Sequence, residues 1–218
     1  MTARPSDLAR ERGVTELLHF TTSNGLIGIL HKGMVLSRGL LEVDDYLENI
    51  KILNSPDRSR DIAWVNWVNL SVSQVNSAFL GHSKGWHVDD DIWWACLSFD
   101  VSLLDHDDVY FCTGNNAYTA TTRGQGVAGF EALFAPRVIW GMYNTPKNRP
   151  ADHPPHLPTD EQAEVLYPGG IDLSYLRAVY VPEPDHLDEV AGIVEVTGTP
   201  DRIDLTGLSV SVAAGIFQ

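Results

Sequence analysis

Short runs of alternating apolar and polar residues recur along this chain and predict a protein rich in β-strands. In the run 16–21, Leu18 and Phe20 would face one side of a strand, whereas His19 and Thr21 would face the other. A strand with polar residues on one face is typical of a sheet that lines a cleft. His19 and Thr21 are therefore candidates for a functional site, although a buried, hydrogen-bonded histidine in an ordinary strand would give the same pattern.

A helix is predicted directly after this strand. Residues 25–32 carry apolar side chains at helical spacing, the polar run 22–24 before them offers an N-cap, and Gly33 favours the helix end. Residues 34–38 are then expected to form a second short strand. Residues 41–53 have apolar positions that are compatible with a further helix.

The rest of the chain continues this mixture of strands and helices. The run 62–79 favours a strand followed by a turn or a short helix, and residues 130–134 favour a helix. The five prolines within residues 142–158 predict a long loop without regular structure. Further strands are predicted over residues 92–99, 109–112, 163–166, 176–181 and 193–196. Because strands and helices do not alternate regularly, we expect an α+β fold with a largely antiparallel sheet.

Composition favours one globular domain over residues 1–218, with residues 1–14 expected to form a flexible N-terminal segment. The chain has 218 residues, 44% of them hydrophobic, which is enough for a full core. No run approaches the roughly eighteen apolar residues of a membrane span. Residues 1–12 also lack the apolar stretch of a signal peptide, so the protein is expected to be cytoplasmic and to have no membrane partner.

Charge and cysteine usage narrow the possible functions. The formal net charge of −14 argues against broad attraction to nucleic acid, so that any nucleic-acid contact must be local. Cys96 and Cys112 lie in apolar runs without zinc-ligand spacing, which favours buried free thiols over a metal site or a disulfide. His153 and His156 lie close together, but no cysteine or carboxylate at ligand spacing accompanies them, and no metal is expected.

Glu164 follows the proline-rich loop, at the start of a predicted strand. Glu164 lies between Ala163 and Val165, where a strand that leaves the loop would direct one polar residue into a pocket. A carboxylate in such a place can hydrogen-bond ribose hydroxyls and stabilise positive charge as a glycosidic bond breaks. A surface glutamate at a strand edge is the alternative interpretation.

The two ends of the chain together resemble the DarT-type ADP-ribosyltransferases, toxins of bacterial toxin–antitoxin systems that attach ADP-ribose from NAD to bases in DNA. The resemblance rests on His19-Phe20-Thr21, Thr22-Ser23-Asn24, the helical run Leu26-Ile27-Gly28-Ile29-Leu30, Gly33, Val35-Leu36-Ser37-Arg38 and, near the other end, Gln162-Ala163-Glu164-Val165-Leu166. Between the two ends the match is only positional. The segment 67–74 departs from the pattern of the family.

This resemblance implies an ADP-ribosyltransferase-like fold, in which a mostly antiparallel, split β-sheet with flanking helices forms a cleft for NAD. It also implies a catalytic role for Glu164 and for an arginine in the polar stretch 54–61, where Arg58 is preferred by its spacing and Arg60 is the alternative. A planar guanidinium there would suit the NAD phosphates or the acceptor base. The residues expected to contact NAD+ are His19, Thr21, Asn24, Gly28 and Arg60, with helix capping as the other role open to Asn24.

The loop before Glu164 lies where transferases of this kind place the segment that selects the acceptor. Its side chains can stack on a base or hydrogen-bond to it, and the expected substrate-binding residues are Tyr143, Lys147, Asn148, Arg149 and His153. The implied function is transfer of ADP-ribose from NAD+ to a nucleobase in single-stranded DNA, with a macrodomain-type antitoxin as partner. An acceptor in RNA or in a protein, or a catalytically silent binding module, is the alternative.

Overall fold

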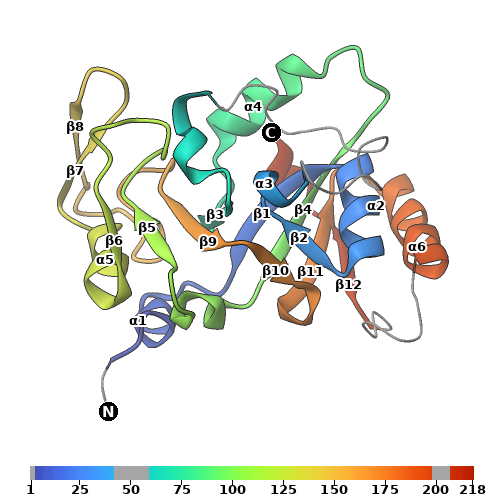
Figure 1. Ribbon diagram of the computed structural model, residues 1–218, viewed down its shortest axis with the longest axis horizontal. Coiled ribbons are helices and arrows are strands. Elements are labelled where there is room, and N and C mark those ends of the chain that lie inside the picture. The colour runs from blue at the N-terminus through green and yellow to red at the C-terminus, as the bar shows by residue number, and fades with distance from the viewer. Residues whose placement is uncertain (1–2, 42–58, 198–206) are drawn as a thin grey trace.

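The computed structural model describes residues 3–41, 59–197 and 207–218 of the protein. The largest element that these residues form is an eight-stranded sheet (Figure 1). In spatial order the sheet contains β12 (Ser209–Val212), β11 (Leu176–Val181), β4 (Trp94–Phe99), β1 (Leu17–Thr22), β3 (Trp67–Val72), β9 (Glu164–Pro168), β5 (Tyr110–Cys112) and β6 (Arg123–Gln125). Neighbouring strands run antiparallel, except that β11 and β12 are parallel. The predicted α+β fold with a largely antiparallel sheet is confirmed.

Two small sheets accompany the large one. The first pairs β2 (Met34–Leu36) with β10 (Gly170–Asp172), and the second is a hairpin of β7 (Arg137–Trp140) and β8 (Thr145–Asn148). The α-helices are α1 (Pro5–Arg12), α2 (Ser23–Lys32), α3 (Arg38–Leu41), α4 (Ser77–Trp86), α5 (Gly126–Ala132) and α6 (Asp185–Thr197). Short 3₁₀ helices are η1 (Ser59–Trp64), η2 (Val101–Asp105), η3 (Leu173–Tyr175) and η4 (Ala214–Phe217). Among the described residues, no helix combines the length and the apolar character needed to cross a bilayer.

Apolar side chains form two clusters on opposite faces of β1. Leu17 belongs to the larger cluster, to which α2 contributes Leu26, whereas Leu18 belongs to the smaller cluster, to which α4 contributes Leu80. Adjacent residues of a strand point to opposite faces, so the two clusters cover the two sides of the sheet. In Figure 1, α2 and α6 lie next to each other, and they are in contact.

The ladder between β1 and β3 is much shorter than the ladders beside it. β1 pairs with β4 along its whole length, but it pairs with β3 only through Leu17–Val72 and Leu18–Ser71. On its other side, β3 pairs with β9 from Trp67 to Ser71. The sheet is therefore split between β1 and β3 beyond Leu18.

The predicted strand and helix at the start of the chain are confirmed as β1 and α2. The N-cap of α2 is Thr22, whose Oγ1 accepts a hydrogen bond from the N–H of Gly25 at 3.0 Å. The capping role considered for Asn24 is therefore wrong, because Asn24 lies inside the first turn. Gly33 ends the helix with a φ of 73°, a left-handed conformation that favours glycine.

Most of the strands predicted further along the chain are present. The strands predicted at 92–99, 109–112, 163–166 and 176–181 correspond to β4, β5, β9 and β11. The helix predicted over 41–53 falls almost entirely outside the described residues.

Residues 193–196, predicted as a strand, belong to helix α6. Apolar side chains of α6 recur at helical spacing and pack against the larger cluster: Leu187, Val190, Ile193 and Val194. The apolar run 193–196 was too short to distinguish a helix from a strand by its period.

The proline-rich stretch 142–158, predicted to lack regular structure, contains strand β8. Pro146 lies inside β8 opposite Ile139 of β7. Because this sheet has only two strands, both are edge strands, and an edge strand tolerates a proline whose missing N–H would not face the partner. After β8, residues 149–163 contain neither helix nor strand, as predicted for most of the loop.

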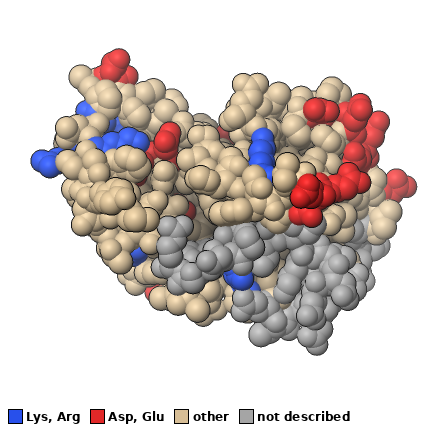
Figure 2. Space-filling model, turned by 90° about the horizontal axis from the view of Figure 1, so that it is seen from above, with Lys and Arg blue, Asp and Glu red and all other residues tan. Residues whose placement is uncertain are grey.

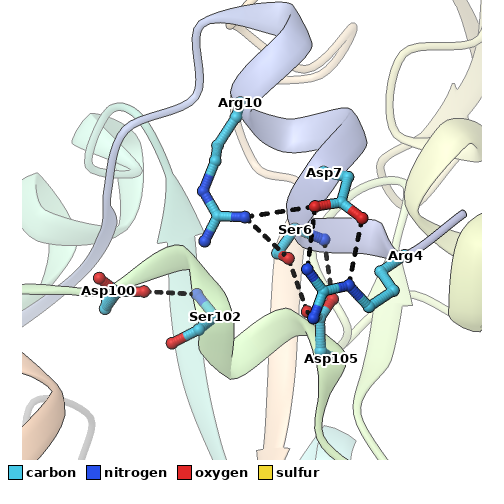
Figure 3. Close-up of polar contacts among 7 residues, drawn as sticks. All are labelled: Arg4, Ser6, Asp7, Arg10, Asp100, Ser102 and Asp105. Atoms are coloured by element: carbon cyan, nitrogen blue, oxygen red, sulfur yellow. Dashed lines mark hydrogen bonds and ion pairs between the residues drawn. The ribbon is translucent and has the colours of Figure 1, made fainter.

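The N-terminal segment 1–14, expected to be flexible, contains helix α1, which packs against the domain. Its anchor is Asp105 at the end of η2, which accepts hydrogen bonds from the N–H of Ser6 at 2.8 Å and from its hydroxyl at 2.6 Å (Figure 3). Pro5 lies in the first turn, where a missing N–H costs nothing, and Ala9 is fully buried. The expectation of a flexible segment rested on its polar composition, which gives no sign of the contact with Asp105, a residue distant in sequence.

Asp105→Ala is expected to lower the free energy of unfolding by about 1–3 kcal/mol, because the substitution leaves the buried Ser6 N–H and hydroxyl without their acceptor. Urea denaturation measures the change. Asp107→Ala, at an exposed position two residues further on, is the matched control and should change stability by less than about 0.5 kcal/mol. Equal losses in the two variants would contradict the anchoring role of Asp105.

Candidate active site

Glu164 is the first residue of β9 and is only 6% exposed. Its neighbours in the two adjacent ladders are Ser71 of β3 and Cys112 of β5, and Cys112 in turn lies opposite Arg123 of β6. Directly opposed residues of antiparallel strands point to the same face of the sheet. Ser71, Glu164, Cys112 and Arg123 therefore form one row across the sheet, which we call the Glu164 row.

The loop that joins β5 to β6 closes over this row. Its Asn116 donates a backbone N–H to Oε2 of Glu164 at 2.9 Å. Arg123 holds the loop by donating to Asn116 Oδ1 and Asn116 O, each at 2.7 Å, to Tyr118 O at 3.1 Å and to Thr121 O at 3.0 Å. The carboxylate of Glu164 is thus bound to a loop that an arginine of the same row shapes.

Cys112 lies between the two charged residues of the row. Burial raises the pKa of its thiol to about 12, the negative charge of Glu164 raises it as well, and Arg123 opposes the shift. Cys112 is therefore a neutral thiol at physiological pH and does not serve as a nucleophile. Cys96 is also buried and free, so the prediction of two buried free thiols is confirmed.

His19 bridges the split in the sheet. Its Nδ1 lies 3.0 Å from the backbone oxygen of Asn69 on β3, just beyond the last ladder pair. Since a carbonyl only accepts, Nδ1 carries a proton and donates it. Burial lowers the pKa of His19 below its ordinary value of 6.5, so the ring is neutral at pH 7.

Thr21 lies beside His19 on the same face of β1 and is 5% exposed. Its hydroxyl packs against the first turn of α2, where a Cβ on Gly25 would lie 2.2 Å from Thr21 Oγ1, so that only glycine fits. Asn24 is half-buried in this turn, and Gly28 is buried further along the helix. The predicted NAD-contacting residues other than Arg60 are thus grouped along β1 and the start of α2.

Strand alternation directs the two parts of the candidate site to different faces of the sheet. Glu164 lies on the face of Ser71 and Leu18, whereas His19 and Thr21 lie on the other face of β1. Beyond Leu18, β1 no longer pairs with β3, so no backbone hydrogen bonds of a ladder close the sheet between the two faces there. The two groups can therefore act on one ligand only if that ligand enters the split.

Of the two predicted arginines, the structure describes only the backbone of Arg60. Arg58 lies outside the described residues, and Arg60 lies in η1, although its side chain is not described. Trp64 at the end of η1 packs edge-on against Tyr110, with ring centroids 5.2 Å apart, and Arg123 lies 5.7 Å from the centre of its ring. The segment that follows Arg58 therefore runs onto the Glu164 row.

Two of the predicted acceptor-binding residues bind to their own loop. Arg149 donates to the backbone oxygens of Leu157 at 2.7 Å and Pro154 at 2.8 Å. Nε2 of His153 lies 2.9 Å from the backbone oxygen of Pro158 and donates to it. These contacts fix the shape of the proline-rich loop, whose prolines supply no backbone N–H donors.

The other predicted acceptor-binding residues lie on the β7–β8 hairpin. Lys147 forms an ion pair with Asp160, at 3.1 Å, and Asp160 is 1% exposed, so this pair ties β8 to the segment that leads into Glu164. Tyr143 at the hairpin turn is 88% exposed, and Asn148 is exposed as well. Tyr143 and Asn148 are thus the ones that face solvent.

Charge is unevenly distributed over the surface. Figure 2 shows acidic side chains gathered at one end of the face that it displays, with most lysine and arginine side chains at the other end and a notch between two lobes.

Within the described ranges, no group of three or more His, Cys, Asp or Glu side chains could hold a metal ion.

A protein-family model described as "ssDNA thymidine ADP-ribosyltransferase, DarT" matches residues 18–206, which include all of β1 except Leu17, the Glu164 row and the hairpin. The chain belongs to the DarT family. A search of curated protein sequences gave no significant match.

Solved DarT structures share the fold of this chain. Thermus sp. 2.9 DarT in complex with NAD+ has a TM-score of 0.61 and 12% identity, and the match covers 94% of this chain and 98% of that one. Thermus sp. 2.9 DarT in complex with ADP-ribosylated ssDNA has the same TM-score, 13% identity and coverage of 94% and 97%. Thermosipho africanus DarTG in complex with ADP-ribose has a TM-score of 0.57 and 18% identity, and the match covers 93% of this chain and 51% of that one. The predicted ADP-ribosyltransferase-like fold is confirmed.

Asn116 and Arg123 are not recognisable from the sequence. Both lie in the Thr- and Gly-rich stretch 115–129, which reads as an ordinary polar loop, and neither belongs to a motif. Only the pairing of β5 with both β6 and β9 brings Arg123 and Glu164 into one row.

The stability contributed by His19 should depend on pH. Its pKa is lower in the folded protein than in the unfolded chain, so below about pH 6.5 the unfolded chain binds more protons, and the free energy of unfolding decreases as the pH falls. His19→Asn keeps a donor for Asn69 but cannot titrate. Urea denaturation at several pH values should show the stability of the wild type falling relative to His19→Asn between pH of about 7 and 5. Parallel pH profiles would show that His19 is not desolvated.

Proposed function

We propose that this protein transfers ADP-ribose from NAD+ to a nucleobase of single-stranded DNA and releases nicotinamide. The observation that carries the proposal is Glu164, a buried carboxylate whose Oε2 is fixed by the N–H of Asn116, in a chain of the DarT family. The ligands in the structures of Thermus sp. 2.9 DarT, NAD+ and ADP-ribosylated ssDNA, support the same reaction. Thymine is the first base to test, because the family description names thymidine.

NAD+ would enter the split between β1 and β3. There His19 and Thr21 would contact it from one face of the sheet and Glu164 from the other. The glycosidic bond breaks, its electron pair leaves with nicotinamide, and the ribose carbon becomes oxocarbenium-like. Glu164 would stabilise this positive charge and accept a hydrogen bond from a ribose hydroxyl, because a fixed carboxylate needs little reorganisation as charge develops.

The acceptor base would then attack the ribose carbon through a ring nitrogen. With thymine, the N–C bond forms as the ring N–H gives up its proton, and Glu164 is the carboxylate placed to take it. An unpaired base does not have to be flipped out of a duplex, so single-stranded DNA avoids that cost.

Other residues are assigned supporting roles. Arg58 is assigned to the NAD phosphates or to the acceptor base, with Arg60 as the alternative, because a guanidinium forms paired hydrogen bonds with either group. Asn24 and Gly28 are assigned to the NAD side through their place on α2.

Among the acceptor residues, Tyr143 and Asn148 are assigned direct contact with DNA because both are exposed. Lys147, Arg149 and His153 are assigned to DNA binding through the loop whose shape their contacts fix. The net charge of −14 fits recognition at a local site rather than along a basic surface.

We also propose that the protein is a cytoplasmic toxin restrained by a macrodomain-type antitoxin. The chain matches 51% of the length of Thermosipho africanus DarTG, so that relative carries a further region of similar size. Co-expression with a macrodomain hydrolase should relieve growth arrest in cells that produce this protein. Relief by a hydrolase-dead macrodomain as well would point to inhibition by binding.

Glu164→Gln should lower the rate of DNA labelling by about 10²–10³-fold, because the amide keeps the shape of the side chain but removes its charge. The assay is transfer of label from adenine-labelled NAD+ to single-stranded oligonucleotides of each base, with RNA and a protein lysate as rival acceptors. Glu161→Gln, at an exposed position in the preceding segment, is the control and should retain activity. If the wild type labels RNA or protein but no DNA, the DNA acceptor is wrong; if Glu164→Gln equals the wild type, the assignment of Glu164 is wrong.

Tyr143→Ala should raise the KM for the oligonucleotide by about 5–100-fold, since stacking of an aromatic side chain on a base contributes about 1–3 kcal/mol. Hydrolysis of NAD+ in the absence of DNA should not change. Trp86→Ala removes another exposed aromatic side chain, on α4, and serves as the control. An equal rise in KM for both variants would place the DNA elsewhere.

A further inference from the structure

Arg123 uses its whole guanidinium inside the protein. All three of its nitrogens donate to the loop between β5 and β6: Nε to Asn116 Oδ1, Nη2 to the backbone oxygens of Asn116 and Tyr118, and Nη1 to the backbone oxygen of Thr121. Such a planar group satisfies several carbonyls at once only if the loop keeps one shape. Arg123 therefore stabilises one conformation of this loop.

Asn116 is the point at which this loop meets Glu164. Its side-chain oxygen accepts from Arg123 and lies 3.7 Å from the thiol of Cys112, its backbone oxygen accepts from Arg123, and its backbone N–H donates to Oε2 of Glu164. Both ends of the residue are thus held by the Glu164 row. Asn116 is 2% exposed, so water does not compete for these bonds.

The row also limits how Glu164 can move. Cys112 lies between Glu164 and Arg123 in the ladder, and its thiol is buried and free. The ring centre of Trp64 lies 5.7 Å from the guanidinium carbon of Arg123. The arginine is therefore held by the loop and by this ring, and Asn116 connects it to Glu164.

We propose that Arg123 is a positioning residue for the transfer reaction: it folds residues 115–121 so that the N–H of Asn116 fixes the carboxylate of Glu164. This inference rests on the proposed function, since it gives Glu164 its orientation toward the ribose. Misplacing a catalytic group by about 1 Å can cost about 10²-fold in rate, so the expected effect falls on kcat.

Arg123→Ala should lower kcat for DNA labelling by about 10–100-fold while the KM for NAD+ changes by less than about threefold. Guanidinium ion at low millimolar concentration should restore a large part of kcat by filling the vacated site, an effect that a merely unfolded protein would not show. Asn116→Ala removes the side-chain acceptor but keeps the backbone N–H, so it should lower kcat less. Arg177→Ala, which removes a mostly exposed arginine paired with Asp100, is the control and should leave kcat unchanged with or without guanidinium.

Hydrogen exchange of the Asn116 amide separates this inference from the proposed function. Exchange should accelerate in both Arg123→Ala and Glu164→Ala, because the first variant loosens the loop and the second removes the acceptor. If exchange accelerates in both while the wild type labels no acceptor, the proposed function fails and the positioning contact stands. Unchanged exchange in Arg123→Ala, or unchanged kcat with a loosened loop, would overturn the inference, as would a KM effect equal to the kcat effect.

Discussion

The short ladder between β1 and β3 is the constraint on which the rest of the site depends. Two residue pairs hold these strands together, and beyond Leu18 the connection passes to the ring of His19, which donates to the backbone oxygen of Asn69. Desolvation keeps this ring neutral, so the bridge adds no charge to the split. A continuous ladder would close the gap and leave His19 and Glu164 on opposite faces of one sheet.

The half of the sheet that carries Glu164 is organised by charged side chains that are bound within the protein. Burying a charged group is costly unless it is paired or hydrogen-bonded, and here the buried Asp160 pairs with Lys147, while the half-buried Arg123 is bound by loop carbonyls. These contacts join the β5–β6 loop, the hairpin and the start of β9. The position of Glu164 is therefore set by tertiary contacts, whereas that of His19 follows from a local strand and its helix.

This difference explains how far the sequence could predict the molecule. Strand β1, helix α2 and the end at Gly33 follow from period and capping, and so did the strand that carries Glu164. Helix α1 was not predictable because its anchor, Asp105, is far away in sequence. Arg123 was hidden for the same reason, since its role depends on strands that pair across long separations.

A crystal structure of the protein with carba-NAD+ and a short single-stranded oligonucleotide tests the central claim most directly. The ligand should lie in the split between β1 and β3, with its nicotinamide ribose within hydrogen-bonding distance of Glu164 and with His19 and Thr21 in contact with the same molecule. A ligand bound away from the split, or one that contacts His19 while Glu164 stays out of reach, would contradict the claim that these residues form a single active site.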